Sequence, residues 1–203
     1  EFVFQRIAHH IDEELLKEAF HRLRKDAAPG IDGQTAAEYA EGLSANLRDL
    51  HERLRTQTYR ATPIKRTWIP KEDGSQRPIG TLILEDKIVQ KAVAMLLEEV
   101  FEQEFYDCSY GFRPGRSPHK ALHAVRELIQ RLHIGWIVDM DIRQFFDSVD
   151  RDIFFDLLHR RVNDGGIDRL LGKWFNAGIL DGDELSYTDL GTPQGGVITP
   201  LTQ

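Results

Sequence analysis

Residues 134–147 read IGWIVDMDIRQFFD, a short apolar run that ends in several carboxylates. A brief, nearly continuous apolar run is typical of a buried strand, so we expect a central strand over Ile134–Met140. Carboxylates at the C-terminal end of such a strand lie at the sheet edge where α/β enzymes bind ligands. Asp139 and Asp141 are two residues apart, so they share one face of a strand. The stretch therefore predicts a fold with a polar site at one edge of its sheet.

Carboxylates gathered in this way are hard oxygen ligands that suit Mg²⁺. The alternative interpretation is an acidic turn, in which Asp147 or Asp150 caps the helix that follows. Taken by itself, the stretch leaves both interpretations open.

Helical spacing of apolar residues flanks the predicted strand on both sides. We expect helices over residues 11–24, 36–57, 85–105, 119–132, 151–162 and 167–177. Alternating residues around a polar turn predict a β-hairpin over 64–80, and a second hairpin is expected within 178–190. The pattern as a whole predicts an α/β (α+β) fold.

Composition restricts the class of protein. The chain has 203 residues, 41% apolar and 29% charged, with a formal net charge of −7, which indicates folded domains and not a disordered chain. No apolar run approaches the roughly 18 residues of a membrane span, and no signal-peptide pattern opens the sequence. A single cysteine, Cys108, excludes an internal disulfide framework and favours a reducing compartment. We therefore expect a cytoplasmic protein that does not bind membranes.

The net acidity conceals segments that are basic. Arg48–Arg77 contains eight Lys and Arg against four Asp and Glu, and Arg113–Arg131 contains five against one. Clustered cations of this kind are the electrostatic footprint of nucleic-acid binding.

Two basic motifs lie in these segments. Lys71 and Arg77 flank the tip of the first hairpin, where two cations can clamp a triphosphate, although lysine on an edge hairpin also serves to prevent aggregation. Arg113 and Arg116 lie in a Pro-Gly loop beside aromatic residues, which offers phosphate-pairing and stacking groups. The alternative for this loop is an ordinary turn with Ser117 as the cap of the next helix.

A glycine-rich loop, Thr192-Pro193-Gln194-Gly195-Gly196, places an amide beside residues that let the backbone approach a ligand closely. The alternative is a plain loop.

The order of the motifs resembles that of the reverse transcriptases encoded by bacterial group II introns. The resemblance extends from about residue 12 to the end and rests on five motifs in the same order. They are Ala28-Pro29-Gly30-Ile31-Asp32-Gly33, Ile69-Pro70-Lys71 with Arg77-Pro78, Tyr110-Gly111-Phe112-Arg113-Pro114-Gly115-Arg116, Asp139-Met140-Asp141-Ile142 with Phe145-Phe146-Asp147, and Thr192-Pro193-Gln194-Gly195-Gly196.

This resemblance implies a right-hand polymerase fold, with fingers over residues 1–132 and a partial palm over 133–203. It implies an RNA-directed DNA polymerase that uses two Mg²⁺ ions in nucleotidyl transfer. Asp141 corresponds to the first catalytic aspartate and is expected to bind metal together with the backbone carbonyl of Ile142.

The resemblance also implies residues that bind the incoming deoxynucleoside triphosphate: Lys71, Arg77, Phe145, Phe146, Gln194 and Gly195. Phe146, with Phe145 as the second candidate, corresponds to the aromatic residue that excludes a ribonucleotide 2′-hydroxyl. Arg113 and Arg116 are expected near the template. The implied partners are an RNA template, intron RNA, and a DNA or RNA primer.

One departure from the family pattern is large. Its Tyr-x-Asp-Asp motif, which supplies the other two catalytic carboxylates, does not occur in the 203 residues. We therefore expect a fingers–palm piece that is catalytically incomplete by itself. The alternatives are an intron RNA-binding (maturase) or self-association module that forms homodimers, or a reverse transcriptase adapted to phage defence or CRISPR.

Overall fold

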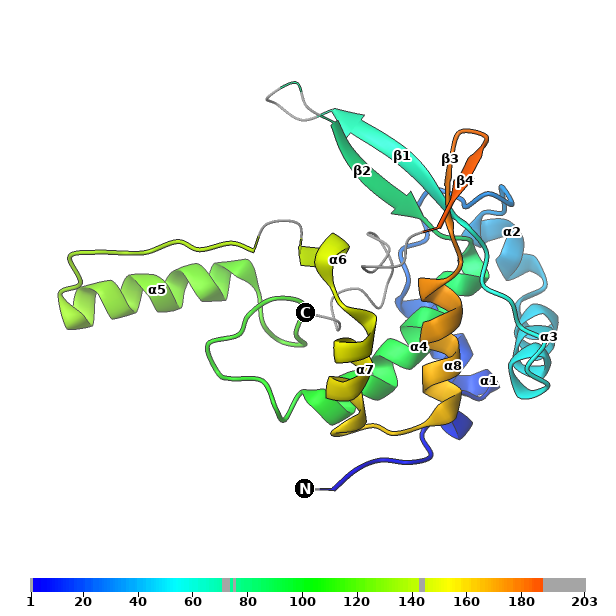
Figure 1. Ribbon diagram of the computed structural model, residues 1–203, viewed down its shortest axis with the longest axis horizontal. Helices are drawn as coiled ribbons and strands as arrows, with labels where there is room; N and C mark the ends of the chain where they lie inside the picture. Colours follow the sequence, from blue (N-terminus) through cyan, green and yellow to red (C-terminus); the bar gives the residue numbers. More distant parts are fainter. Residues whose placement is uncertain (1, 71–73, 75, 143–144, 188–203) are drawn as a thin grey trace.

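The structure, a computed structural model, describes residues 2–70, 74, 76–142 and 145–187. Helices and one small sheet make up the fold, which confirms the α+β prediction (Figure 1). The helices of this part are η1 (Ala8–His10), α1 (Glu13–Arg22), α2 (Ala36–Glu41), α3 (Leu43–Arg55), α4 (Leu84–Phe101), α5 (Pro118–Leu132), α6 (Phe145–Ser148), α7 (Arg151–His159) and α8 (Gly165–Phe175). Among them, none is both long enough and apolar enough to cross a membrane.

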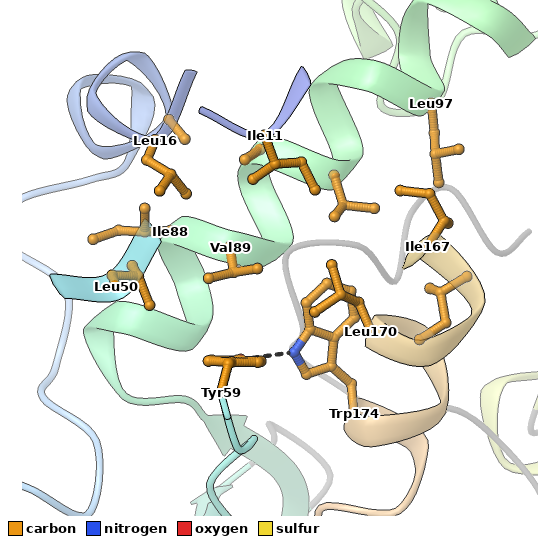
Figure 2. Close-up of a cluster of buried hydrophobic side chains, with 14 of the residues drawn as sticks. Ile11, Leu16, Leu50, Tyr59, Ile88, Val89, Leu97, Ile167, Leu170 and Trp174 are labelled. Carbon is orange, nitrogen blue, oxygen red and sulfur yellow. Dashed lines mark hydrogen bonds between the residues drawn. The ribbon is translucent and has the colours of Figure 1, made fainter. Parts of the chain in front are cut away.

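Helix α4 lies at the centre of the hydrophobic core. It is apolar on most sides, as expected of a helix that neighbours cover all round, and its buried residues include Ile88, Val89 and Leu97. Figure 2 shows side chains of the N-terminal helices on one side of it and those of α8 on the other. The predicted helix over 85–105 is therefore confirmed and forms the axis of the fold.

The single helix predicted over 36–57 is wrong, because the structure divides it into α2 and α3 at Gly42. Gly42 has φ −118° and ψ 27°, outside helical geometry. Glycine is unfavourable in a helix interior by about 1 kcal/mol relative to alanine. At the break, the side chain of Asn46 donates a hydrogen bond to the Tyr39 carbonyl at 3.0 Å. A side chain thus replaces part of the backbone pairing.

Gly30, from the first motif, is a packing residue. A Cβ atom there would lie 2.6 Å from the backbone nitrogen and Cα of Ile83, far inside van der Waals contact. Lys87 on α4 donates to the Ala28 carbonyl at 2.9 Å and holds the same loop. The turn before α2 is therefore fitted closely to the start of α4.

The sheet has the strand order β2-β1-β3-β4 and comprises β1 (Ile64–Pro70), β2 (Gln76–Thr81), β3 (Ile179–Asp181) and β4 (Glu184–Ser186). Strands β1 and β2 are antiparallel, β1 and β3 are parallel, and β3 and β4 are antiparallel. Both predicted hairpins are thus confirmed. The β1–β2 hairpin projects beyond the helical body (Figure 1).

The strand predicted over Ile134–Met140 is wrong. Residues 134–142 form neither strand nor helix, and they are exposed, with Trp136 at 91% and Met140 at 86%. A strand must pair its backbone groups with a neighbour, and no strand of the described ranges pairs with this segment. Helix α5, which Ser117 caps as in the alternative interpretation of its loop, precedes the segment and projects from the body without a buried residue (Figure 1). We call residues 118–142 the arm.

Three polar side chains meet inside the core. The hydroxyl of Tyr59 donates to Asp86, which also accepts from the backbone nitrogen of Thr62 at 2.9 Å. The indole nitrogen of Trp174 donates to the Tyr59 hydroxyl at 3.0 Å (Figure 2). Asp86 is fully buried, and this burial raises the pKa of its carboxyl group above the ordinary value. The network joins α4, α8 and the segment that follows α3.

Asp164 fastens the N-terminal segment to α8. Its carboxylate accepts from the backbone nitrogens of Ile7 at 2.5 Å and Ala8 at 2.9 Å, and it caps α8 through Gly166 at 2.7 Å. Burial acts to raise the pKa of this carboxyl group, but the backbone hydrogen bonds hold it below the ordinary value.

Candidate functional site

The β1–β2 hairpin carries the first group of predicted site residues. Its register pairs Ile69 with Arg77, which places Arg77 one pair from the last described pair before the tip. Lys71 lies outside the described residues. Along β1, the Trp68 indole nitrogen donates to Asp181 on β3 at 3.2 Å, and Arg66 lies 3.9 Å from the same carboxylate. These contacts hold β1 against β3.

Asp141 and Ile142 lie at the end of the exposed segment that follows α5. Both side chains are exposed, with Ile142 at 65%. Asp141 makes no hydrogen bond or ion pair with another described residue. Its carboxylate and the Ile142 carbonyl are hard oxygen donors of the type that Mg²⁺ prefers. They fit as part of a metal site, although the described ranges contain no cluster of three or more His, Cys, Asp or Glu residues suited to a metal.

The capping alternative, which named Asp147 or Asp150, is confirmed for Asp150, and the side chain of Asp147 lies outside the described part. The carboxylate of Asp150 accepts from the backbone nitrogens of Asp152 at 2.9 Å and Ile153 at 3.1 Å, and so caps α7. The carboxylates of this stretch therefore have different roles: Asp150 has a structural partner, whereas Asp141 has none in the described part.

Helix α6 carries the two predicted aromatic residues. Phe145 is half-buried at its first position and Phe146 is the next residue of the helix. Gln194 and Gly195 lie outside the described residues, so the structure bears on neither.

Arg113 is buried inside its own loop. Its guanidinium group donates to Glu102 at 2.8 Å and to the carbonyls of Tyr106 at 2.8 Å and Ser109 at 3.0 Å. It also lies over the ring of Phe105, 5.0 Å from its centroid. The same group holds the pKa of the Glu102 carboxyl below its usual value. Arg113 thus fixes the path of the loop, and its predicted contact with nucleic acid stays a prediction.

Arg116 is more accessible than Arg113. Its side chain is 28% exposed, whereas that of Arg113 is 6% exposed. It lies 3.3 Å from the carboxylate of Asp107, which is itself fully exposed, and over the ring of Tyr110. Of the two arginines, Arg116 is therefore the better placed to exchange its partner for a phosphate.

The sequence patterns missed a pocket on another part of the molecule. It has a volume of about 290 Å³ and lies between η1, the C-terminal half of α3, and α8. Arg169 and Lys173 line it from α8. Their spacing of four residues, which places both on one helix face, was the available signal. We call this region the cationic pocket.

Residues 69–203 match the reverse transcriptase (RNA-dependent DNA polymerase) family. The chain is 36% identical over 178 residues to Protein YkfC of Escherichia coli (strain K12), which covers 85% of the chain and 46% of that protein. It is 34% identical over 173 residues to the group II intron-encoded protein LtrA of Lactococcus lactis subsp. cremoris, with coverage of 85% and 28%.

A third relative is nuclear intron maturase 1, mitochondrial, of Arabidopsis thaliana. It is 34% identical over 82 residues, which cover 40% of the chain and 11% of that protein. The chain thus spans less than half of the length of each of these three relatives.

Proposed function

Because the chain belongs to the reverse transcriptase (RNA-dependent DNA polymerase) family, we propose that it supplies the nucleotide-binding and first metal-binding part of an RNA-directed DNA polymerase. The resemblance to group II intron proteins that the five motifs indicated is confirmed by the family match and by relatives that carry intron names. We accordingly propose a polymerase of the group II intron type, with an RNA template as its substrate.

The accessible carboxylate of Asp141 is the observation that carries the proposal. The carboxylates of Asp150 and Asp164 cap helices α7 and α8 and so have structural partners. Asp141 is exposed and has no partner in the described part of the chain. In the proposed site its carboxylate and the Ile142 carbonyl hold Mg²⁺. When bound, Mg²⁺ supplies activation of a primer 3′-hydroxyl and neutralisation of the pyrophosphate leaving group.

The remaining roles follow from the positions of the motifs. Lys71 and Arg77, which flank the turn residues of the hairpin in the sequence, hold the triphosphate of the incoming nucleotide. Phe145 or Phe146 on α6 limits the sugar to a deoxyribose, and Gln194 with Gly195 lines the base. Arg116 contacts the template, while Arg113 keeps that loop in shape.

A nucleotide-binding measurement tests this function directly. We expect the 203-residue chain to bind a fluorescent deoxynucleoside triphosphate more tightly with Mg²⁺ than with EDTA. Asp141→Asn should remove the dependence on Mg²⁺. Arg77→Gln should weaken binding about tenfold, the lower end of the 1.5–3 kcal/mol of a charged hydrogen bond. Lys17→Gln, at an exposed position of α1, is the matched control and should change nothing. Binding that is indifferent to Mg²⁺ and to Asp141 would overturn the proposal.

A primer-extension assay tests catalytic completeness separately. The 203 residues contain one of the three expected aspartates, so we expect no Mg²⁺-dependent extension of a primer on an RNA template. Robust extension would show that the Tyr-x-Asp-Asp carboxylates are dispensable, without affecting the nucleotide-binding result.

Intron RNA binding is the second candidate function. It is favoured by the maturase-named relative and by the basic segments of the sequence. Binding of RNA that survives Asp141→Asn but weakens with added salt would support it.

A further inference from the structure

Half of the exposed large apolar side chains in the described part of the chain lie in the arm. On α5 they are Leu122, Val125, Leu128 and Leu132, whose spacing of three and four residues places them on one face. Six more lie in residues 134–142. Together these side chains present on the order of 400–800 Å² of apolar surface, compared with about 300–600 Å² for the largest patch of a typical monomer. The arm therefore has the surface of an interface.

Residues 134–142 have the pattern of a strand that is apolar on one face. Alternate residues of a strand share a face. One face here carries Asp139 and Asp141, and the other is entirely apolar: Ile134, Trp136, Val138 and Met140. Apart from the Ile134 nitrogen, which donates to the Ile129 carbonyl at 3.2 Å, the backbone of this segment has no hydrogen bond with another described residue. An apolar segment with free backbone groups is a template for pairing with another chain.

We propose that the arm is a dimerisation element, in which residues 134–140 of two copies pair as antiparallel strands about a twofold axis. An antiparallel pair of identical strands is symmetric, so the same surface serves both copies. A register centred on Ile137 pairs Trp136 with Val138, and the apolar faces of the two strands then coincide. Two adjacent strands are about 10 Å wide, which matches the diameter of a helix. The apolar faces of the two α5 helices cover this two-stranded sheet, which is unstable without such cover.

The charges and the size of the arm suit this arrangement. The register places Asp141 opposite His133 of the second copy, two residues after Arg131 at the end of α5. Asp139, Asp141 and Arg131 have no hydrogen bond or ion pair with another described residue of their own chain, so these charges are available to a second copy. The apolar surface alone approaches the roughly 800 Å² that each partner buries in a standard interface.

A second copy fits the arm better than a membrane surface does. A lipid surface would cover the apolar face of α5, but it would leave the backbone of residues 134–142 without hydrogen bonds and would lie against two carboxylates. In the dimer, the strand face that carries Asp141 stays open. Dimerisation and metal binding at Asp141 are therefore separate properties.

Analytical ultracentrifugation of the 203-residue chain, in EDTA and without nucleotide, tests the proposal. We expect an equilibrium between monomer and dimer with no larger species. Val138→Lys places a charge on the apolar strand face and should raise the Kd of the dimer about tenfold or more, with an unchanged circular dichroism spectrum. Ile153→Lys adds the same charge at an exposed apolar position of α7 and should change the Kd less than about twofold. Equal effects of the two variants would overturn the proposal, because they would reflect net charge alone.

Disulfide trapping tests the register. Ile137 lies opposite itself in the proposed pair, with Cα atoms about 4.5–5.5 Å apart, a separation that a disulfide can bridge. The two copies of Gly135 lie about 13 Å apart along the strands, which is too far. In a Cys108→Ser background, which removes the exposed native thiol, Ile137→Cys should form a covalent dimer with diamide and Gly135→Cys should not. Equal trapping at both positions, or none at position 137, would overturn the twofold pairing.

The emission of Trp136 gives a third readout. In dilute protein this side chain is open to iodide, and dimerisation should protect it. A chain that stays monomeric at every concentration would overturn the proposal, and a monomer that co-sediments with phosphatidylserine vesicles would assign the arm to a lipid surface instead. A species whose mass keeps growing with concentration would overturn the twofold geometry. None of these readouts uses Mg²⁺ or nucleotide, so failure of this proposal and failure of the polymerase proposal are distinguishable.

Discussion

The buried hydroxyl of Tyr59 provides the sharpest test of the fold. The substitution Tyr59→Phe keeps the ring and removes an oxygen that donates to Asp86 and accepts from Trp174. Both partners are buried, with Asp86 at 0% and Trp174 at 3% exposure. Neither partner can turn to water after the substitution.

The expected cost follows from one orphaned donor, the Trp174 indole N–H, and from one lost hydrogen bond to the Asp86 carboxylate, which keeps its bond from the Thr62 nitrogen. A buried polar group without a partner costs about 1–3 kcal/mol and a hydrogen bond to a charged group is worth about 1.5–3 kcal/mol, so the two losses together cost about 2.5–6 kcal/mol. We take about 3 kcal/mol as the expected loss in the free energy of unfolding. In a chain of this size that loss lowers the Tm by about 6–12 °C.

The dependence on pH adds a second readout. Burial raises the pKa of Asp86, so ionisation of this group lowers stability as pH rises through its folded pKa. The Tyr59 hydroxyl opposes this by favouring the carboxylate. The destabilisation by Tyr59→Phe should therefore be largest near pH 8 and shrink as pH falls toward 4.

Urea unfolding, followed by tryptophan fluorescence and circular dichroism, measures the effect. Tyr106→Phe is the control, because that side chain is 82% exposed, and its effect should stay within 0.5 kcal/mol. A loss below 0.5 kcal/mol for Tyr59→Phe, or one that is the same at pH 4 and pH 8, would refute the reasoning.

Three further predictions concern other parts of the fold. Gly30→Ala should cost about 1–3 kcal/mol in urea unfolding because its Cβ would meet the Ile83 backbone, whereas Gly111→Ala, which has open space, should be neutral. Asp164→Asn should cost about 1–3 kcal/mol at pH 7. That difference should vanish in acid, because a lowered carboxyl pKa stabilises the fold above about pH 3.8 and the gain is lost as pH falls through the folded pKa. In iodide quenching, Trp136, at 91% exposure, should supply the most accessible tryptophan emission, and Trp136→Ala should remove it; an unchanged quenching curve would contradict the exposed position of the arm.

Local sequence patterns predicted the helices and hairpins that local interactions determine. The spacing of apolar residues gave α1, α4, α7 and α8 within a few residues, and the two hairpins followed from turn residues between alternating segments. The break at Gly42 was missed because one glycine within a long periodic segment is a weak signal, and its effect depends on Asn46.

The features that the sequence patterns did not predict depend on contacts between residues that are distant in the sequence. The run Ile134–Met140 has the composition of a strand, but composition does not supply the neighbouring strand that its backbone needs. The internal contacts of Arg113 were also missed, because an arginine in an aromatic loop gives no sign that its guanidinium group donates to Glu102 at the C-terminal end of α4. Its contact with nucleic acid stays a prediction. The cationic pocket was missed because its lining residues come from η1, α3 and α8, which meet only through tertiary structure.

The pairing of β1 with β3 connects the hairpin to a segment more than 100 residues later in the chain. This parallel pairing involves two residue pairs at the foot of the hairpin, while the rest of β1 pairs with β2. The hairpin is therefore attached to β3 at its base, and its outer part extends beyond that attachment. Strand β3 begins four residues after α8 ends, so the base of the hairpin lies only a short stretch of chain away from the helix that carries Arg169 and Lys173.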